Sequence, residues 1–293
     1  MQIRGCGSDS MARTEAFPKK RRAPWGAAAI VAVTLVIALC APWIVPHDPE
    51  AIDPGNSLLP PWFAEGGTTE FLLGTDRLGR DVLSRILLGT RVSLGVAAVA
   101  LAIGGIVGTL LGMVAGYRGG WVDVIIMRLA DTFLAFPSVL MALVLAVTVG
   151  PGFGVVALVL GLVLWARFAR LIRGEVLSWK QRDFVALARV SGARGGYIML
   201  HHLLPNITNS LVVLGTLQVG WAIVVEASLT FLGAGIPPPT PTWGGMVAEG
   251  LDFVESAWWI SVMPGLAIIL VVFAFNLLGD WLRDRLDPQL RSL

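Results

Sequence analysis

Charged side chains are scarce in this chain of 293 residues, and their scarcity excludes an ordinary soluble protein. Asp, Glu, Lys and Arg together form 14% of the residues, against about 25% in typical globular domains. Hydrophobic residues form 55%, and the mean hydropathy is +0.74. The net charge of only +2 indicates no basic face for nucleic acid. The composition therefore predicts a protein that crosses a membrane several times.

Catalytic and nucleotide-binding motifs are also lacking. The sequence has neither a His-Glu-x-x-His nor a Gly-x-Ser-x-Gly arrangement, and none of its three lysines follows a glycine in a P-loop. Adjacent His201 and His202 point to different faces of a helix, so they are not expected to share a metal ion. Cys6 lies in a polar tail and Cys40 in an apolar run, which argues against a disulfide. We predict no active site, metal site or bound cofactor in this chain.

Long apolar runs are abundant instead. Six of them reach the roughly 20 residues that a helix needs to cross about 30 Å of hydrocarbon. We therefore predict an all-α membrane protein with six transmembrane helices. Pro137 and Pro264 are expected to kink the third and the sixth. The runs cover residues 25–45, 93–117, 122–149, 153–172, 207–231 and 259–278.

The distribution of charge predicts which segments lie on each side of the membrane. Lys and Arg are retained on the cytoplasmic side, and segments 46–76 and 233–258 contain acidic residues but no Lys or Arg. We therefore predict that both termini are cytoplasmic and that these two segments, the first a proline-dense arm without helix, lie outside. Basic residues cluster before the first run and after the fourth: Lys19, Lys20, Arg21, Arg22, Arg167, Arg170, Arg173, Lys180, Arg182, Arg189 and Arg194. Four others are assigned to an amphipathic helix at the outer interface: Arg77, Arg80, Arg85 and Arg91.

These boundaries divide the chain into four regions. The first run, the arm and the amphipathic helix form one region, and the other five runs form the permeation core with its cytoplasmic loop. Both Met1 and Met11 stay open as the true start. The regions are a cytoplasmic tail over 1–22, the first helix with the arm over 23–92, the core over 93–282 with its loop over 180–206, and a cytoplasmic tail over 283–293.

Two features inside the apolar runs carry predictions about packing and transport. Gly104, Gly108, Gly112 and Gly116 recur every four residues, which predicts a smooth helix face for close packing against another helix. Glu226 is the one clear acid deep within a run. It is either a structural acid bonded to a neighbouring helix or a residue that lines a transport pathway. Self-powered secondary transporters usually hold several such groups, so we expect a pore whose energy source lies elsewhere.

The loop after the fourth run has two amphipathic stretches separated by glycines. Gly192 is expected to form a bend with positive φ between two short helices, and Pro205 to close the second. The exposed face is expected to bind a partner, or else to rest on lipid headgroups. Residues of one face recur at helical spacing: Phe184, Leu187, Ala188 and Ser191, then Tyr197, Leu200, His201 and Leu204.

The same loop has a spacing known from transport proteins. Its matching residues are Ala186, Leu187, Ala188, Gly192, Leu204 and Pro205. They resemble the cytoplasmic Glu-Ala-Ala loop of ATP-binding-cassette importer permeases, which continues with a glycine and ends in Leu-Pro. Ala186 replaces the glutamate, and Asp183, one turn earlier, is the candidate for the missing acid. The resemblance implies that this loop contacts an ATPase subunit.

Further motifs narrow the resemblance. They are LGTDRLGRDVLSR at 73–85, SLTFLG at 228–233 with PPTPTWG at 238–244, and NLLGD at 276–280 with the charged stretch that follows. In this order they resemble the second permease subunit of dipeptide, oligopeptide and nickel importers. The resemblance implies the type I importer permease fold in a bacterial inner membrane. It also implies a second homologous permease, two ATPase subunits or domains that hold ATP and Mg, a solute-binding protein and surrounding lipid.

The cargo and the function class stay open at this point. The resemblance favours peptides, while nickel, glutathione and other small solutes are alternatives. A secondary transporter or channel, and a membrane-anchored scaffold, are alternatives of other classes. In an importer, ATP-driven closure of the ATPases would push the element 183–205 and open the pathway outward.

The outer segments are the predicted docking surface for a solute-binding protein. Both the arm 46–76 and the segment 233–258 are acidic and carry large aromatic residues. Acidic residues would steer a basic patch on the partner and make docking sensitive to salt. The docking candidates are Trp62, Phe63, Glu65, Glu70 and Trp243.

Overall fold

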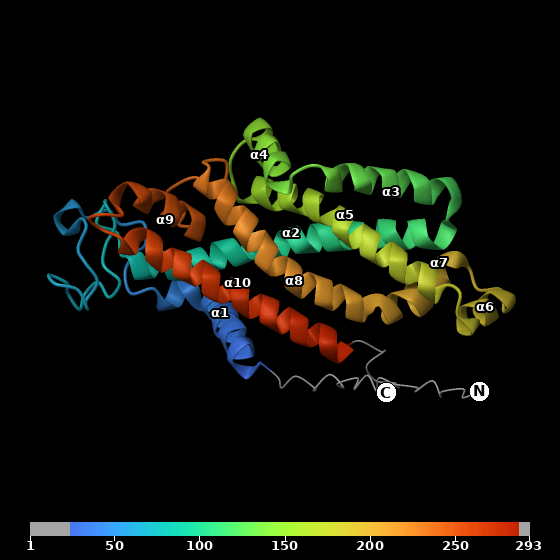
Figure 1. The fold of residues 1–293 in the computed structure, drawn as a ribbon. Coiled ribbons are helices and arrows are strands. Elements are labelled where there is room, and N and C mark those ends of the chain that lie inside the picture. Colours follow the sequence, from blue (N-terminus) through green and yellow to red (C-terminus); the bar gives the residue numbers. More distant parts are fainter. Residues whose placement is uncertain (1–23, 287–293) are drawn as a thin grey trace, which may run out of the picture.

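Helices dominate residues 24–286, the part of the chain that the computed structural model describes (Figure 1). The predicted tail 1–22 and most of the predicted tail 283–293 lie outside the described residues. The long helices are α1 (Trp25–Ile44), α2 (Val82–Arg118), α3 (Gly120–Ala135), α4 (Ser138–Val149), α5 (Phe153–Trp179), α8 (Leu204–Phe231) and α10 (Trp259–Leu286). The shorter elements are η1 (Pro54–Asn56), α6 (Asp183–Val190), α7 (Gly195–Tyr197), the π-helical turn η2 (Ile198–Leu203), α9 (Trp243–Gly250) and η3 (Leu251–Phe253).

Within residues 24–286, five helical segments are long and apolar enough to cross a membrane: α1, α2, α5, the continuous segment Gly195–Phe231, and α10. α3 and α4 pass the same test only as a pair, and their axes differ by 92°. α2 and α5 lie side by side and run in the same direction, since successive glycines of α2 face successive residues of α5 (Figure 1). The α3–α4 pair must therefore return the chain to the start of α5. With this broken segment as the sixth crossing, the helices agree with the predicted all-α membrane fold.

The third predicted span is two helices and not one kinked helix. α3 ends at Ala135, and Phe136 is extended, with φ −81° and ψ 141°. The ring of Pro137 disfavours a helical conformation in the residue before it, and Pro137 has no N–H to continue the helix. The expected kink is therefore a complete break. Pro264, in contrast, lies within the single helix α10.

The glycine strip of α2 forms its contact with α5. A Cβ atom added at Gly108 would lie 2.4 Å from the carbonyl oxygen of Trp165 and 2.6 Å from Cβ of Phe168. A Cβ atom at Gly112 would lie 2.6 Å from the carbonyl oxygen of Ala169. All four glycines of the strip are buried. The predicted packing face is confirmed, because only glycine allows the two backbones to approach this closely.

α2 is longer than predicted and includes part of the segment assigned to a separate amphipathic helix. It begins after Asp81, whose carboxylate accepts hydrogen bonds from two N–H groups of the first turn. Arg85 and Arg91 are residues of this helix. Arg80 and Arg85 do not lie at a lipid interface, since they are only 4% and 1% exposed. For these two residues the prediction is wrong, because the carboxylates of Asp76 and Glu249 bind both arginines.

Two helices near the predicted loop 180–206 also extend further than expected. Arg167, Arg170 and Arg173 are residues of α5 and not of a loop that follows it. The segment Gly195–Phe231 is continuous, because α7 passes through η2 into α8. Pro205, which was expected to close a helix, instead lies in the first turn of α8. Proline has no N–H to donate, and it closely follows the π-helical turn η2, where the regular hydrogen-bond pattern of the α-helix is already interrupted.

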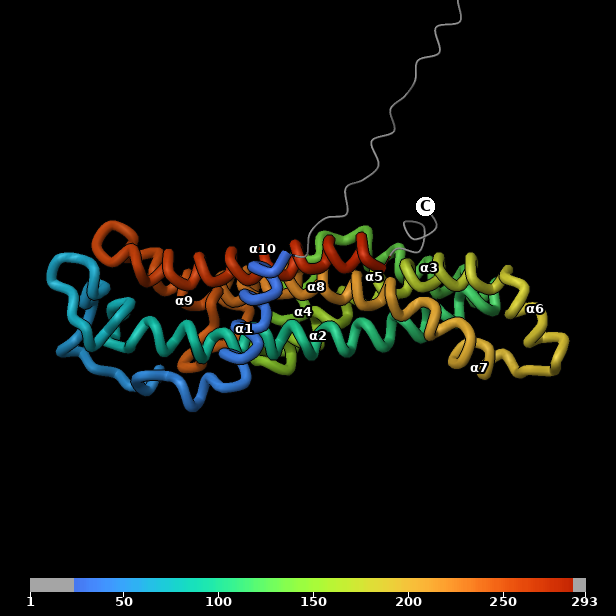
Figure 2. Tube along the Cα trace, turned by 90° about the horizontal axis from the view of Figure 1, so that it is seen from below, coloured from blue at the N-terminus to red at the C-terminus, as the bar shows by residue number. Residues whose placement is uncertain are grey.

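The bundle has two distinct ends (Figures 1 and 2). The arm and α9 gather at one end, and α6 and α7 project from the opposite end. α1 crosses obliquely over α2 and α10 and contacts both. Between the ends, apolar side chains of α2, α5 and α8 fill the centre, among them Ala100, Leu160, Leu164 and Leu229. The two ends of the bundle therefore expose separate surfaces.

Candidate functional site

Val185 attaches α6 to the rest of the protein. Its side chain is fully buried in an apolar cluster with Ile172 and Val176 of α5 and with Ile198 and Leu203 of η2. Burial of one such side chain contributes about 1.5–3 kcal/mol. A push on α6 would therefore reach the ends of α5 and α8 through direct packing.

The opposite face of α6 is apolar and open. Leu187 is 66% exposed and Val190 is 87% exposed. Asp183 and Ala186 are exposed as well. Ala188, which was predicted on the open face, is instead half-buried against the bundle, because it lies one turn from the anchoring valine. α6 thus has one face that holds it in place and one that is free to meet another surface.

Gly192 ends α6 in a left-handed conformation. Its φ is 82°, and no atom lies within 4 Å of the position that a Cβ would occupy. Its N–H donates to the carbonyl oxygen of Arg189 at 3.0 Å. The N–H of Ala193 donates to the carbonyl oxygen of Ala188, also at 3.0 Å. These two bonds form a Schellman motif, which typically has glycine at this position. The predicted positive φ is confirmed, and the space around Gly192 shows that backbone conformation alone requires glycine there.

The last two predicted coupling residues, Leu204 and Pro205, lie at the start of α8. Leu204 is half-buried against the same apolar cluster that anchors α6, and Pro205 is exposed. The structure therefore brings all the predicted coupling residues to one end of the bundle. Within this group, α6 has the exposed apolar surface, and α8 runs from this end along the bundle (Figure 1).

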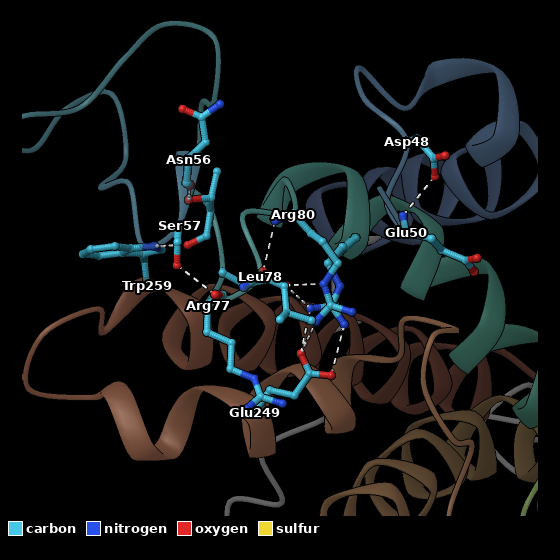
Figure 3. A network of polar contacts seen from close by, with 12 residues as sticks. Asp48, Glu50, Asn56, Ser57, Arg77, Leu78, Arg80, Glu249 and Trp259 are labelled. Atoms are coloured by element: carbon cyan, nitrogen blue, oxygen red, sulfur yellow. Dashed lines mark hydrogen bonds and ion pairs between the residues drawn. The ribbon is translucent and has the colours of Figure 1, made fainter. Parts of the chain in front are cut away.

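At the other end, two arginines and two acids form a buried network that joins the arm, α2 and α9 (Figure 3). Asp76 Oδ2 accepts hydrogen bonds from Arg80 Nε at 2.7 Å and from Arg85 Nη1 at 2.5 Å. Glu249 Oε2 accepts from Arg80 Nη2 at 2.9 Å and from Arg85 Nη1 at 2.7 Å. Two positive and two negative charges thus compensate one another. The pairing offsets the high cost of removing these charges from water.

The sequence contained only part of the signal for this network. Arg80 and Arg85 are basic residues beside an otherwise acidic outer segment, where they need counter-charges. Asp76 precedes Arg80 by four residues, so this pair was within reach of prediction. Glu249 is 164 residues from Arg85, and no local pattern relates the two.

Further hydrogen bonds fix the arm to the bundle and order it internally (Figure 3). Trp259 Nε1 of α10 donates to the carbonyl oxygen of Thr75 at 3.0 Å. Ser57 Oγ donates to the carbonyl oxygen of Arg77 at 2.8 Å. The proline-dense arm is therefore ordered and largely without helix, as predicted.

Most of the predicted docking candidates lie on the outer surface of the arm. Trp62 is 58% exposed and Phe63 is 52% exposed. The ring of Phe63 also contacts Trp258, with 6.4 Å between the ring centroids. Glu65 and Glu70 are exposed. These side chains form a surface that is both aromatic and acidic.

Trp243 does not belong to that surface. It is 1% exposed, and its Nε1 donates to the carbonyl oxygen of Ile86 at 3.1 Å. Its ring fills the contact between α9 and α2, where the Cβ position of Gly89 lies 3.2 Å from it. Its assignment as an exposed docking residue is wrong, because burial of this large side chain holds α9 against α2.

Glu226 of α8 is completely buried and bonded on both oxygens. Ser93 Oγ of α2 donates to Oε2 at 2.8 Å, and Thr230 Oγ1 donates to Oε1 at 2.9 Å. One of the two donors belongs to a neighbouring helix. These contacts favour a structural acid over a residue that lines a pathway. No group of three or more His, Cys, Asp or Glu side chains in residues 24–286 is arranged to hold a metal ion.

Two family models match the chain. Residues 108–292 match the inner membrane component of binding-protein-dependent transport systems. Residues 19–61 match the N-terminal transmembrane domain of oligopeptide transport permease C. The first match covers more than half of the chain and includes α5, α6, α8 and α10. The chain belongs to this permease family.

The permease is similar to relatives along most of its length. It is 44% identical over 255 residues to the di/tripeptide transport system permease protein DppC of Pseudomonas aeruginosa, covering 87% of this chain and 84% of the relative. It is 41% identical to the glutathione transport system permease protein GsiD of Pectobacterium atrosepticum, covering 89% and 85%. It is 41% identical to the dipeptide transport system permease protein DppC of Haemophilus influenzae, covering 94% and 93%.

Membership of the family settles the general role of the permease. It is a multi-pass inner-membrane subunit of an ATP-binding-cassette importer that depends on a binding protein. Its partners include an ATPase and a binding protein, and it is not itself the ATPase. The predicted family, fold and transport role are confirmed.

Proposed function

We propose that this permease forms the membrane pathway of an importer for short peptides. Relatives that are 41–44% identical to it are named as dipeptide, di/tripeptide or glutathione permeases. Glutathione is itself a peptide with free carboxylates, so these cargoes share one chemical class. In this proposal a second homologous permease completes the pathway, two ATPase subunits or domains supply the energy, and lipid covers the outer apolar faces.

We further propose that the exposed face of α6 is the contact surface for an ATPase subunit. This observation carries the proposal: α6 is anchored by Val185, while Leu187 and Val190 are left open. Two large apolar side chains one turn apart on the same open face form a patch of the kind that a partner surface covers. ATP-driven closure would push α6, and the packing around Val185 would carry the motion into α5 and α8.

The charge pattern supports an orientation for this assembly. Arg182, Arg189 and Arg194 lie around α6, whereas segments 46–76 and 233–258 contain no Lys or Arg. Positive charge is retained in the cytoplasm, so we place α6 and both termini there. The arm and α9 then face outward, where the surface formed by Trp62 and Phe63 would receive the loaded binding protein.

Reconstitution of the complete importer tests the function. The permease, its second permease and the ATPases would be placed in liposomes, and uptake of a labelled dipeptide would be measured. The proposal predicts uptake only when ATP and the loaded binding protein are both present. Uptake driven by an ion gradient without ATP would instead favour a secondary transporter, and passive equilibration would favour a channel.

A further inference from the structure

Arg167 lies in α5, one of the helices long and apolar enough to cross a membrane, and five residues before the end of the apolar run 153–172. α5 spans Phe153–Trp179, and Arg167 faces Gln218 and Trp221, which lie near the middle of α8. A charged side chain inside a membrane span is costly, by about 2.5–3.5 kcal/mol at the centre and less towards the ends, unless it is compensated. Such residues are rare and face a protein interior or a water-filled path.

The groups that hold Arg167 are neutral. Its Nη1 donates to Gln218 Oε1 at 2.8 Å, and its guanidinium lies 4.2 Å from the ring centroid of Trp221. The next two arginines of α5 differ, because Arg170 pairs with Asp131 of α3 and Arg173 pairs with Asp123 of α3. Arg167 has no carboxylate partner among residues 24–286.

The two nearest acids along these helices are already engaged. Glu175, about two turns from Arg167 along α5, accepts from Ser210 Oγ at 2.7 Å and from Trp179 Nε1 at 3.1 Å. Glu226, about two turns from Gln218 along α8, is bonded to Ser93 and Thr230. The positive charge of Arg167 is therefore oriented by its neighbours but not neutralised by them.

A cleft lies on the α6 side of this position, and its lining does not include Arg167, Gln218 or Trp221. It has a volume of about 410 Å³ and lies between α5, α8 and α10. Leu171 in its lining is one turn beyond Arg167, and Leu217 in its lining precedes Gln218. Polar residues line it as well: Glu175, Asn206, Asn209, Ser210 and Arg283. The partly polar cleft therefore begins about one helical turn from Arg167 along α5.

We infer that Arg167, held in place by Gln218 and Trp221, is a site in the pathway that binds a carboxylate of the passing peptide. This inference rests on the proposed peptide cargo. A guanidinium has five N–H donors, and Gln218 accepts from one of them, which leaves donors for a bidentate bond to a carboxylate. Every free peptide carries such a group at its C-terminus. Because the site is neutralised only while cargo is present, it favours entry of carboxylate-bearing solutes without a permanent internal partner.

The test compares two cargoes that differ only in the carboxylate. Uptake of alanyl-alanine and of its C-terminal amide would be measured in the reconstituted importer, at saturating concentrations of separately loaded binding protein. Capture by the binding protein then does not limit the maximal rate. Arg167→Gln is expected to lower the maximal rate for the free acid about tenfold, the effect of losing a hydrogen-bonded charge pair, and to leave the rate for the amide unchanged.

A second variant keeps the test informative if Arg167→Gln fails to assemble. Gln218→Glu places a permanent carboxylate beside Arg167, and it is expected to cause the same selective loss for the free acid. Arg170→Gln, which breaks the pair with Asp131 on the same helix, is the control and should leave the preference between the cargoes unchanged.

The outcomes separate this site from the proposed cargo. Equal losses for both cargoes in Arg167→Gln and Gln218→Glu would overturn the site, because a structural role or a pair with a carboxylate of the second permease predicts such losses. A wild-type importer that moves neither peptide with ATP would instead overturn the proposed function itself.

Discussion

Arg85 of α2 and Glu249 of α9 form a two-bond ion pair, with 2.7 Å from Nη1 to Oε2 and 3.2 Å from Nη2 to Oε1. The side chain of Arg85 is only 2% exposed, and that of Glu249 is 19% exposed. The pair closes a network with Asp76 and Arg80, so the arm, α2 and α9 are joined at one point. We expect this network to stabilise the packing of the arm, α2 and α9 against one another.

Glu249→Gln is expected to destabilise the outer end. The substitution keeps the size of the side chain but leaves the two arginines with only Asp76 as a counter-charge. Breaking a buried pair typically costs about 3 kcal/mol or more, so the thermal unfolding midpoint of the purified importer should fall by several degrees. Glu255→Gln, at an exposed acid of the same outer segment, is the matched control. Equal midpoints for the two variants would show that the network does not stabilise the fold.

Gly108→Ala is expected to damage the contact between α2 and α5. The added Cβ would lie 2.4 Å from the carbonyl oxygen of Trp165, so the helices must separate. Gly105→Ala on the same helix is the control, since its Cβ would meet nothing closer than 3.8 Å. The yield of assembled importer and its thermal stability should fall for Gly108→Ala alone. If both variants assembled equally well, the strip would not be a packing surface.

Cysteine labelling is expected to place the arm outside and α6 inside. Single cysteines at Thr68 and Ser191, both exposed, would be introduced into a chain in which Cys6 and Cys40 are replaced. A membrane-impermeant maleimide added to spheroplasts should label position 68 but label position 191 only after lysis. Labelling of 191 before lysis, with 68 protected, would reverse the orientation.

Charge reversal on the arm is expected to slow delivery of cargo. Glu65→Lys with Glu70→Lys replaces two exposed acids of the arm, which also carries Trp62 and Phe63, with bases. Association steered by charge weakens, so uptake at limiting binding protein should fall severalfold, and the difference from wild type should shrink at high salt. ATP hydrolysis without binding protein should not change. Normal uptake at limiting binding protein would remove these acids from the docking surface.

The sequence predicted those structural features that depend on residues close together in the chain. The spacing of Gly104 to Gly116 predicted a close contact between two helices, because a glycine strip has few other uses in a membrane helix, but it did not identify α5 as the partner. The bend at Gly192 was predictable because Schellman motifs favour glycine. The exposure of Leu187 followed from the helical spacing of residues around it.

Features that depend on distant partners were not predictable from the sequence. Pro137 is compatible with either a kink or a break in the helix. Which of the two forms depends on distant contacts, such as the Arg173–Asp123 ion pair that holds α3 against α5. Glu249 and Arg85 meet only after the whole bundle forms. Trp243 is a large aromatic residue in an outer segment, a type that is common in docking surfaces. It is buried only because α9 packs on α2.

The central claim is that α6 couples the ATPase to the transmembrane helices, and its most direct test is ATP hydrolysis stimulated by loaded binding protein. Gly192→Val forces a branched residue to adopt φ near 82°, at a cost of about 1–3 kcal/mol, and Leu187→Asp places a charge on the exposed face. Gly196→Val is the control, because that position has neither a positive φ nor an atom within 4 Å of its Cβ. We expect Gly192→Val and Leu187→Asp to insert normally but to lose most of the stimulated hydrolysis, while Gly196→Val retains it. Wild-type stimulation in Gly192→Val and Leu187→Asp would contradict the coupling role and would make α6 a helix of the membrane surface.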